Sequence, residues 1–332
     1  MDAPFEEFRL QAIPVVMPFQ SGEVNMYLYD GGQTLTLFDA AFPLDDSWDA
    51  LQRALAAWGR STGDIGRIIL THHHFDHTGL VGRVVAASGA EVCGHPEMPL
   101  QAGLAYTYDE AHNAWMRETL GGLGVPEDLV EQLVARRPIV KPLVYRVDRL
   151  DRALDDGALV DGFRVCHVPG HSATDTLFVH EAQGFSITGD HILERITPNP
   201  LLRRPPNGMK RGRSLVQFEE SLRRCRALEM GWCFPGHGAP FADHHPVVDR
   251  ILSTHEKRTG RLLASLPAAG ATPYETARHL YPRMGIDMLF LCMSVAVGHS
   301  ELLEAQGLLR SATEAGVLRY FPVAAENPEK VN

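Results

Sequence analysis

The chain has 332 residues, of which 45% are hydrophobic and 22% are charged, and its formal net charge is −10. This balance is typical of a globular protein, and the length allows two domains. The negative charge disfavours a general nucleic-acid binder, because affinity for a phosphate backbone comes mainly from Lys and Arg.

The cysteines and the first twenty residues predict a cytoplasmic protein. The five cysteines are Cys93, Cys166, Cys225, Cys233 and Cys292. Their odd number, without C-x-x-C or zinc-knuckle spacing, indicates reduced thiols. Cys166 and Cys233 could bind metal, but small buried apolar side chains are the preferred interpretation. Acidic residues and the prolines at 14 and 18 exclude a signal peptide at the start, and we expect no membrane partner.

The first predicted elements are a hairpin and an amphipathic helix. Strands at 24–29 and 34–38 flank Asp30-Gly31-Gly32, which is typical of a tight turn. Asp39 therefore stands at the end of a strand. Four apolar residues then recur at helical spacing and predict a helix packed on a sheet. They are Trp48, Leu51, Leu55 and Trp58.

A dense cluster of metal-binding residue types follows the apolar run 68–70. It contains His72, His73, His74, Asp76 and His77. Alternation in an extended segment points His72 and His74 to one side and His73 to the other, so we leave His73 out. Asp76 and His77 begin a predicted helix and face away from the first pair, which suggests a second metal. A polar loop with hydrogen-bonded histidines is the alternative, but the density of ligands disfavours it. Zinc suits such ligands, and iron or manganese would also fit.

The rest of the chain alternates strands with helical stretches. Residues 96–142 read as helices broken by glycines. A strand at 163–168 ends at Pro169-Gly170 and presents His171. Another at 185–188 leads to Asp190, where Gly189 lets the backbone approach closely. A third leads through Pro235-Gly236 to His237.

The run His72-x-His74-x-Asp76-His77 resembles the signature of the metallo-β-lactamase-fold hydrolases. Asp39, His171, Asp190 and His237 follow the order of that family's other landmarks over residues 8–250. Ala173 and Thr174 depart from the Pro and Gly usual after the third histidine. The resemblance implies an α/β fold, a four-layer αββα sandwich. It also implies a catalytic domain at 1–250 in which the 96–142 insertion commonly forms a cap, with a helical decoration packed elsewhere as the alternative.

The resemblance also implies a centre of two divalent metal ions. His72, His74 and His171 would hold the first ion, and Asp76, His77 and His237 the second. Asp190 and a water would bridge the two ions, and the bridging hydroxide would be the nucleophile. Asp76 and Asp190 would hold it and relay its proton, while Asp39 and Thr71 would orient ligand histidines. His191 is expected to support a ligand or to face the substrate.

Two later segments raise the question of the partner. Nine Lys or Arg against three Glu give residues 194–226 a net charge of +6, which could attract an anion or belong to a solvated loop and helix. Residues 251–332 are similar to a small winged-helix-like domain, mostly helical, with a capping box at Thr272-Pro273-Tyr274-Glu275, a helix at 289–309 and a strand at 317–321. A packing or dimerisation module, giving a homodimer, is the preferred interpretation. His299 is expected to be a buried core histidine.

These features favour a hydrolase of a thioester or ester of a small anionic molecule, similar to the hydroxyacylglutathione hydrolases. An endoribonuclease that uses residues 195–226 and the C-terminal domain is the alternative. A lactonase is disfavoured because no Tyr follows Asp190 in His191-Ile192-Leu193. An iron redox enzyme of the flavodiiron type is disfavoured because no flavin-binding segment is evident. A pure binding protein would turn over no substrate. Without a G-x-S-x-G elbow or a phosphate loop, water is the expected nucleophile.

Overall fold

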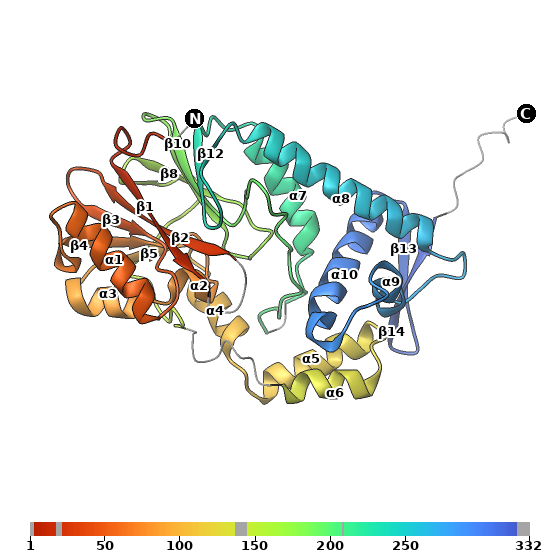
Figure 1. Cartoon of the computed structure of the whole chain (residues 1–332). Coiled ribbons are helices and arrows are strands. Elements are labelled where there is room, and N and C mark those ends of the chain that lie inside the picture. Colours follow the sequence, from red (N-terminus) through yellow and green to blue (C-terminus); the bar gives the residue numbers. More distant parts are fainter. Residues whose placement is uncertain (1–2, 18–21, 137–144, 208, 324–332) are drawn as a thin grey trace, which may run out of the picture. The chain divides into compact units, whose positions relative to one another are not determined.

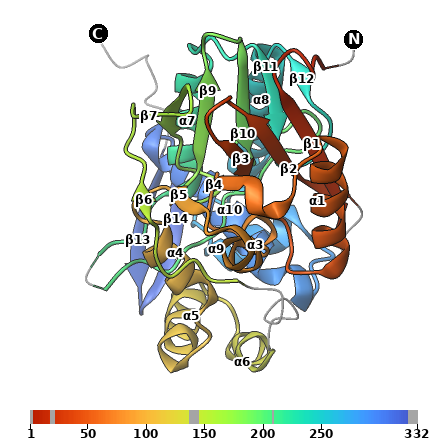
Figure 2. The same ribbon diagram turned by 90° about the vertical axis from the view of Figure 1, so that its left-hand side faces the viewer.

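Two six-stranded sheets carry the residues of the predicted site (Figures 1 and 2). The computed structural model describes residues 3–17, 22–136, 145–207 and 209–323. The chain forms two units. The first comprises 1–107, 138–198 and 203–252, and the second comprises 108–137, 199–202 and 253–332. Both sheets belong to the first unit.

The first sheet has the order β1-β2-β3-β4-β5-β6. Its strands are β1 (Leu10–Val16), β2 (Glu23–Asp30), β3 (Leu35–Phe38), β4 (Ile65–Ile69), β5 (Glu91–Gly94) and β6 (Arg152–Ala153). The predicted hairpin is β2–β3, which pairs antiparallel, whereas β3, β4 and β5 run parallel. Parallel strands end at the same edge of a sheet, so the residues after β3 and β4 lie close together.

The second sheet has the order β12-β11-β10-β9-β8-β7. Its strands are β7 (Leu159–Val160), β8 (Phe163–His167), β9 (Thr176–His180), β10 (Phe185–Gly189), β11 (Trp232–Pro235) and β12 (Phe241–Ala242). Strands β10 and β11 are parallel, and they deliver Asp190 and His237 to one edge. The start of β2 holds the loop that follows β11, because Asn25 Nδ2 donates to the carbonyl oxygens of Pro235 and Gly238.

Aromatic side chains fill the space between the two sheets. The ring centroids of Phe38 and Phe163 are 5.0 Å apart, and those of Tyr27 and Phe234 are 5.7 Å apart. On the other face of the first sheet, α1 (Asp45–Ala57) and α3 (Val81–Ser88) pack against the strands. Helix α7 (Ser214–Cys225) lies beside the second sheet (Figure 1). The predicted α/β fold of two sheets between helices is confirmed.

The predicted helix is α1, and Trp58 directly follows its last residue, Ala57. Leu51 and Leu55 are buried, while Trp48 and Trp58 are partly buried against the same core. The predicted helix after the histidine run divides into a short α2 (Phe75–Thr78) and α3.

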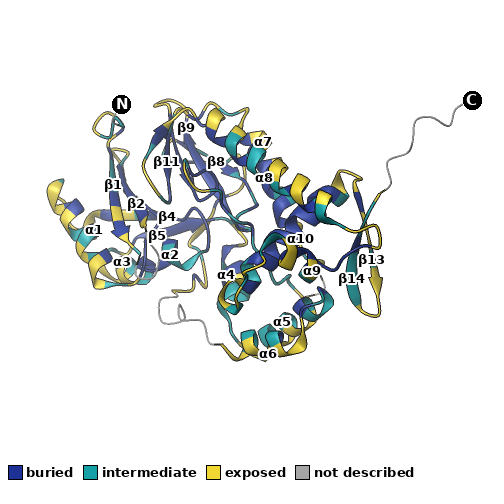
Figure 3. Cartoon of the chain, turned by 45° about the vertical axis from the view of Figure 1, so that its right-hand side comes forward, coloured by how far each residue is buried: buried dark blue, intermediate teal, exposed yellow. Residues whose placement is uncertain are grey.

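The second unit is mostly helical. Its elements are α5 (Glu110–Gly122), α6 (Glu127–Ala135), α9 (Pro273–Leu280), α10 (Leu289–Ala305), β13 (Leu309–Glu314) and β14 (Val317–Pro322). The core of this unit joins Leu120 and Val130 to Met293 and Val297 of α10. Figure 3 shows that much of α10 is buried. Helix α8 (His245–Ser265) crosses the boundary between the units.

The two units differ from the expected domains in where the helical insertion belongs. Its first helix, α4 (Met98–Tyr106), belongs to the first unit, but residues 108–137 cluster with the C-terminal part. The apolar faces of α5 and α6 pack into the core of α10, which explains this membership. The remainder of the expected insertion, 138–142, lies outside the described residues. A cap over the site stays a prediction.

The C-terminal elements follow the sequence with one correction. The capping box is present, since Glu275 N donates to Thr272 Oγ1 and Thr272 N donates to Glu275 Oε2. The last helix was predicted to reach Leu309, which is wrong. It ends at Ala305, Gly307 adopts a positive φ of 74°, and Leu309 opens the hairpin β13–β14. His299 is buried as expected, and its Nδ1 lies 2.9 Å from Thr259 Oγ1.

One helical stretch, Ile286–Ala305, is long and apolar enough to span a membrane, with a mean hydropathy of 1.5. However, 72% of that window is buried inside the protein. A helix that is apolar on all sides and buried is typical of a protein core.

Candidate metal centre

The seven side chains predicted to bind metal lie together at the edge where β3, β4, β10 and β11 end. Three groups have ligating atoms within 4.8 Å of one another. They are His72, His74 and His171; His72, His77 and Asp190; and Asp76, His77 and His237. The turn between β4 and α2 supplies His72 and His74, and α2 itself supplies Asp76 and His77. The histidine run, the Pro-Gly turn and the two strand ends therefore converge on one small volume.

Hydrogen bonds at Nδ1 orient three of the rings toward the centre. His77 Nδ1 is 2.8 Å from Asp39 Oδ2, and His72 Nδ1 is 3.0 Å from Thr71 Oγ1. His237 Nδ1 is 2.8 Å from the carbonyl oxygen of Glu23. A partner at one ring nitrogen leaves the other, Nε2, to bind a metal. His74 is turned the other way, with its Nδ1 only 3.0 Å from His171 Nε2.

Asp39 occupies a special backbone position. Its φ is 57°, a left-handed conformation that few residues other than glycine adopt. Its carboxylate accepts hydrogen bonds from Thr71 N at 2.8 Å and Thr71 Oγ1 at 2.9 Å, besides its contact with His77. One buried carboxylate thus connects the end of β3 to the histidine turn.

The Asp190 carboxylate lies among histidines of both predicted sites. Its Oδ2 is 3.6 Å from His171 Nε2 and 3.2 Å from His237 Nε2, and its Oδ1 is 3.5 Å from His77 Nε2. Gly236 permits this approach, because a Cβ there would lie 2.3 Å from Asp190 Oδ1. A carboxylate so placed can offer one oxygen to each of two cations.

Four histidines of the centre fall into two pairs, one with lowered and one with raised pKa values. Burial lowers the pKa of His72 well below its usual value and that of His74 to about 4, so these rings are neutral, which is the form that binds metal. At His77 and His237, burial acts in the same direction, but the carboxylates of Asp190 and Asp76, joined at His77 by Asp39, together outweigh it. The pKa of His77 rises well above its usual value, and that of His237 rises to about 10.

The carboxylates of the centre remain ionised. Burial would raise the pKa of Asp76, but His77 and His237 lower it to about 2. The pKa of Asp190 is likewise well below its usual range, because these two histidines outweigh its burial. Carboxylate charge that favours protons on histidine also favours metal cations, because both neutralise it.

Several polar atoms at the centre are buried without a hydrogen-bond partner. They include His72 Nε2, His77 Nε2 and Asp190 Oδ1. Burying such groups without a partner is costly, and a bound cation would satisfy them together. Nitrogen and oxygen ligands in this number fit a divalent metal such as zinc, iron or manganese.

Two neighbouring histidines lie outside these groups. His73 points away, as alternation predicts, and its Nδ1 is 2.8 Å from Thr174 Oγ1. His191 is only 1% exposed, and its expected role beside a ligand or toward a substrate stays a prediction. Its ring instead packs on Phe218, and its Nδ1 is 4.0 Å from Asp175 Oδ2.

Sequence reasoning missed the side chains that shape the turn after His171. Asp175 accepts hydrogen bonds from Ser172 N at 2.8 Å and Ser172 Oγ at 2.5 Å. Thr174, which departs from the family's usual Gly, binds His73 and so ties this turn to the histidine run. The signal was present, since a polar S-x-T-D stretch directly after a turn residue is typical of side-chain-capped turns.

The cysteines take no part in the ligand groups. All five are unpaired and buried, as expected of small apolar side chains. Burial raises the pKa of the Cys93 thiol to about 12 and also raises the pKa values of the Cys166 and Cys233 thiols.

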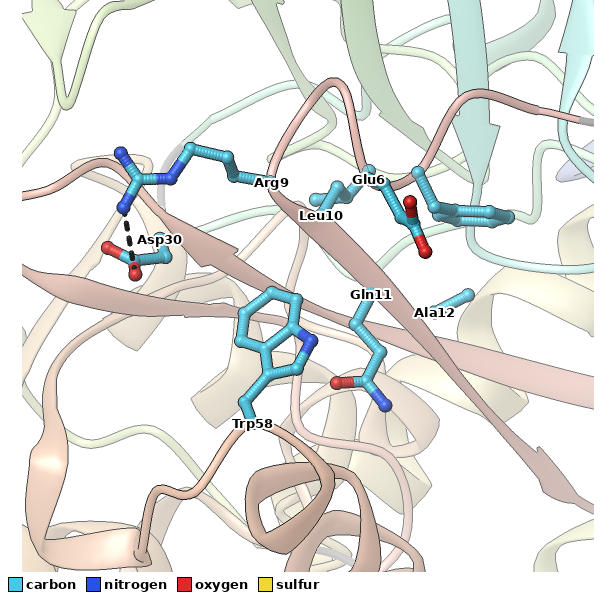
Figure 4. Close-up of a pocket in the computed structure, with 8 residues that line it drawn as sticks. Glu6, Arg9, Leu10, Gln11, Ala12, Asp30 and Trp58 are labelled. Carbon is cyan, nitrogen blue, oxygen red and sulfur yellow. Dashed lines mark ion pairs between the residues drawn. The ribbon is translucent and has the colours of Figure 1, made fainter.

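The pocket in Figure 4 lies near the opposite end of β2 from the centre, around Asp30 and the start of β1. Its volume is about 560 Å³, and Arg9, Gln11 and Trp58 line it. Arg9 and Asp30 pair with each other at 3.0 Å. The histidine and carboxylate groups, rather than this pocket, provide the chemistry of a reaction centre.

Comparisons with known proteins agree with this geometry. The family model of the metallo-beta-lactamase superfamily matches residues 21–240. The Probable metallo-hydrolase YqjP of Bacillus subtilis (strain 168) is 32% identical over 314 residues, which cover 93% of this chain and 96% of that protein. A crystal structure of a metallo-beta-lactamase family protein from Thermus thermophilus is 29% identical with a TM-score of 0.76, covering 95% of this chain and 99% of that one.

A more distant relative is an Atrochrysone carboxyl ACP thioesterase of Aspergillus fumigatus, 24% identical over 242 residues. The match covers 73% of this chain and 44% of that protein. The family match spans the strands and turns that bring the seven side chains together. The chain is therefore a metallo-hydrolase of the metallo-beta-lactamase superfamily.

Proposed function

We propose that this protein hydrolyses a thioester or ester of a small anionic molecule at a centre of two divalent metal ions. The convergence of His72, His74, His171, Asp76, His77, His237 and Asp190 carries the proposal. When bound, the two ions would supply Lewis-acid activation of water and of the substrate carbonyl. Zinc suits the nitrogen and oxygen ligands, and iron or manganese is compatible with them.

The residues would divide the work by position. His72, His74 and His171 would hold one ion, and Asp76, His77 and His237 the other, with Asp190 between them. Asp39 and Thr71 would keep two rings in the orientation and tautomer that ligation requires.

The proposed reaction needs only water as a second reactant. The water oxygen forms a bond to the acyl carbon, and the bond from this carbon to sulfur or oxygen breaks. Asp76 is suited to carry a proton from the water to the leaving group, because its carboxylate remains 16% exposed at the rim of the centre. Asp190 is enclosed by histidines and is suited to hold the attacking water in position. The products are a carboxylic acid and a thiol or an alcohol.

Support for a thioester comes from the thioesterase relative and from an oxygen and nitrogen ligand set like that of the hydroxyacylglutathione hydrolases. The buried, unpaired cysteines support a reducing compartment, and we place the protein in the cytoplasm. We also propose that the C-terminal unit is a winged-helix-like domain and that it serves for dimerisation. RNA is a weaker candidate, because Arg195, Arg223 and Arg226 of the basic segment pair with carboxylates.

The test is turnover by the metal-loaded protein on a panel of acyl thioesters, matched oxygen esters and a labelled RNA. We expect thioester or ester hydrolysis that disappears in His74→Ala and persists in His279→Ala, a surface histidine of the second unit. Cleavage of RNA without hydrolysis of any thioester or ester would replace the proposal with the nuclease alternative. Activity that His74→Ala retains in full would refute both.

A further inference from the structure

Arg203 differs from three exposed arginines of the basic segment. Arg195, Arg223 and Arg226 each form an ion pair with a carboxylate. Arg203 instead donates from Nε to Ser214 Oγ at 3.2 Å and from Nη2 to Gln217 Oε1 at 3.1 Å, and both acceptors are neutral. Its Nη1 is enclosed without a hydrogen-bond partner. Within the described ranges, no carboxylate forms an ion pair with this guanidinium.

A partly buried cation without a counter-ion is unfavourable, because desolvation is not offset by a nearby opposite charge. Burial accordingly lowers the pKa of Arg203, and Asp175 and Glu97 oppose this effect only from beyond ion-pair distance. A guanidinium can bind the two oxygens of a carboxylate or phosphate in parallel, which suits it to receive an anion.

The anchors of Arg203 place it next to the turn that carries His171. Ser214 and Gln217 belong to the first turns of α7. The next residue, Phe218, packs on Gly170 so closely that a Cβ there would lie 2.5 Å from the Phe218 Cα. Further along α7, Ser221 Oγ donates to the carbonyl oxygen of Pro169 at 2.9 Å.

The turn after His171 also contacts the histidine run, because His73 Nδ1 lies 2.8 Å from Thr174 Oγ1. Arg203 itself is not a member of the ligand groups.

We propose that Arg203 binds an oxyanion group of the substrate, a carboxylate or a phosphate, and thereby determines the preference of this hydrolase for anionic substrates. The anion takes the place of the neutral Gln217 acceptor at the guanidinium and provides the counter-charge. This role rests on the proposed function and specifies its substrate class. Arg203 acts on binding and selectivity, while the seven residues of the centre retain the chemistry.

The experiment compares thioesters that differ only in one anionic group. One pair is the succinyl and butyryl thioesters of N-acetylcysteamine, with a carboxylate on the acyl side. The other pair is the butyryl thioesters of phosphopantetheine and pantetheine, with a phosphate on the leaving side. Wild type, Arg203→Met, Arg203→Lys and Arg195→Met are assayed after metal loading. Arg195, whose side chain is 91% exposed, is the matched control from the same segment.

In one of the pairs, wild type should prefer the anionic member, and Arg203→Met should lower that preference in kcat/KM by about tenfold or more through KM. The neutral member and the metal content should change little. Arg203→Lys should retain part of the preference, and this variant decides the test if Arg203→Met fails to fold. Arg195→Met should behave as wild type. Equal anion preference in wild type and Arg203→Met, or no preference in wild type, would overturn the assignment.

A calorimetric titration separates this inference from the proposed function. Succinate and inorganic phosphate are titrated into metal-loaded wild type and Arg203→Met. If wild type hydrolyses none of the four thioesters, the thioester proposal fails, and the titration alone decides the role of Arg203. Binding of either anion that weakens about tenfold in the variant supports anion recognition. Equal affinities overturn it.

Discussion

The Asp39→Asn substitution tests how one buried carboxylate organises the centre. Asp39 Oδ1 accepts from Thr71 N, while Oδ2 accepts from both Thr71 Oγ1 and His77 Nδ1. An asparagine has one acceptor oxygen instead of two. If that oxygen serves Thr71 Oγ1 and His77, the NH₂ group faces the Thr71 N–H, and a buried donor loses its partner.

The magnitude follows from these contacts. One unsatisfied buried donor costs about 1 to 3 kcal/mol of folding free energy. Loss of the charged partner of a ligand histidine weakens metal affinity by about 10- to 100-fold, or roughly 1.4 to 2.7 kcal/mol. Asp39→Asn should therefore lower both the stability and the metal affinity, while the fold remains.

Competitive metal titration and chemical denaturation of wild type, Asp39→Asn and Asp30→Asn measure both effects. Asp30 is the matched control, because it ends β2 away from the centre and its side chain, 24% exposed, pairs with Arg9 at the surface. Its replacement should cost at most about 1 kcal/mol and should leave metal affinity unchanged. Wild-type metal affinity in Asp39→Asn would refute the positioning of His77 by Asp39.

Other predictions follow from the same geometry. Gly236→Ala should abolish metal binding, because the added Cβ would lie 2.3 Å from Asp190 Oδ1. Gly103→Ala is the control and should be tolerated, because nothing lies within 4 Å of its added Cβ. Metal analysis of both variants checks this. Removal of metal by a chelator should lower the Tm in a scanning calorimeter, since a ligand that binds the folded state stabilises it, and an unchanged Tm would argue against the site. Burial among cations lowers the pKa of His299 to about 3 in the folded protein. As the pH drops below the pKa of this histidine in the unfolded chain, the unfolded chain is protonated first, so the stability of the folded protein falls. Between pH 7 and pH 4, the free energy of unfolding of His299→Leu should therefore fall by roughly 3 kcal/mol less than that of wild type, as measured by denaturation at each pH. An equal fall in wild type and variant would contradict the prediction.

Local patterns were sufficient for much of the fold. The turn chemistry of Asp30-Gly31-Gly32 predicted the β2–β3 hairpin, and the capping box at Thr272 predicted the start of α9. The end of α10 was misplaced because apolar residues continue past Ala305 into β13, and periodicity does not separate an apolar helix from an adjoining strand. Strand β1 was missed because Pro14 interrupts its pattern, although the edge position of this strand tolerates a proline.

The candidate site was accessible from sequence because its residues follow strand ends in recognisable turns. The four ligands of the histidine run are adjacent in sequence, and His171, Asp190 and His237 could be placed through family order. Arg203 and Asp175 could not, since their roles depend on which side chains α7 and the turn after His171 bring near them. The membership of α5 and α6 in the second unit likewise depends on long-range packing against α10.

The most direct measurement is anomalous diffraction from crystals of the zinc-loaded protein, recorded on both sides of the zinc absorption edge. Two peaks are expected, one among His72, His74 and His171 and one among Asp76, His77 and His237, with Asp190 in contact with both. An absence of peaks at these side chains, or peaks held by other residues, would contradict the metal centre on which the proposed hydrolysis depends.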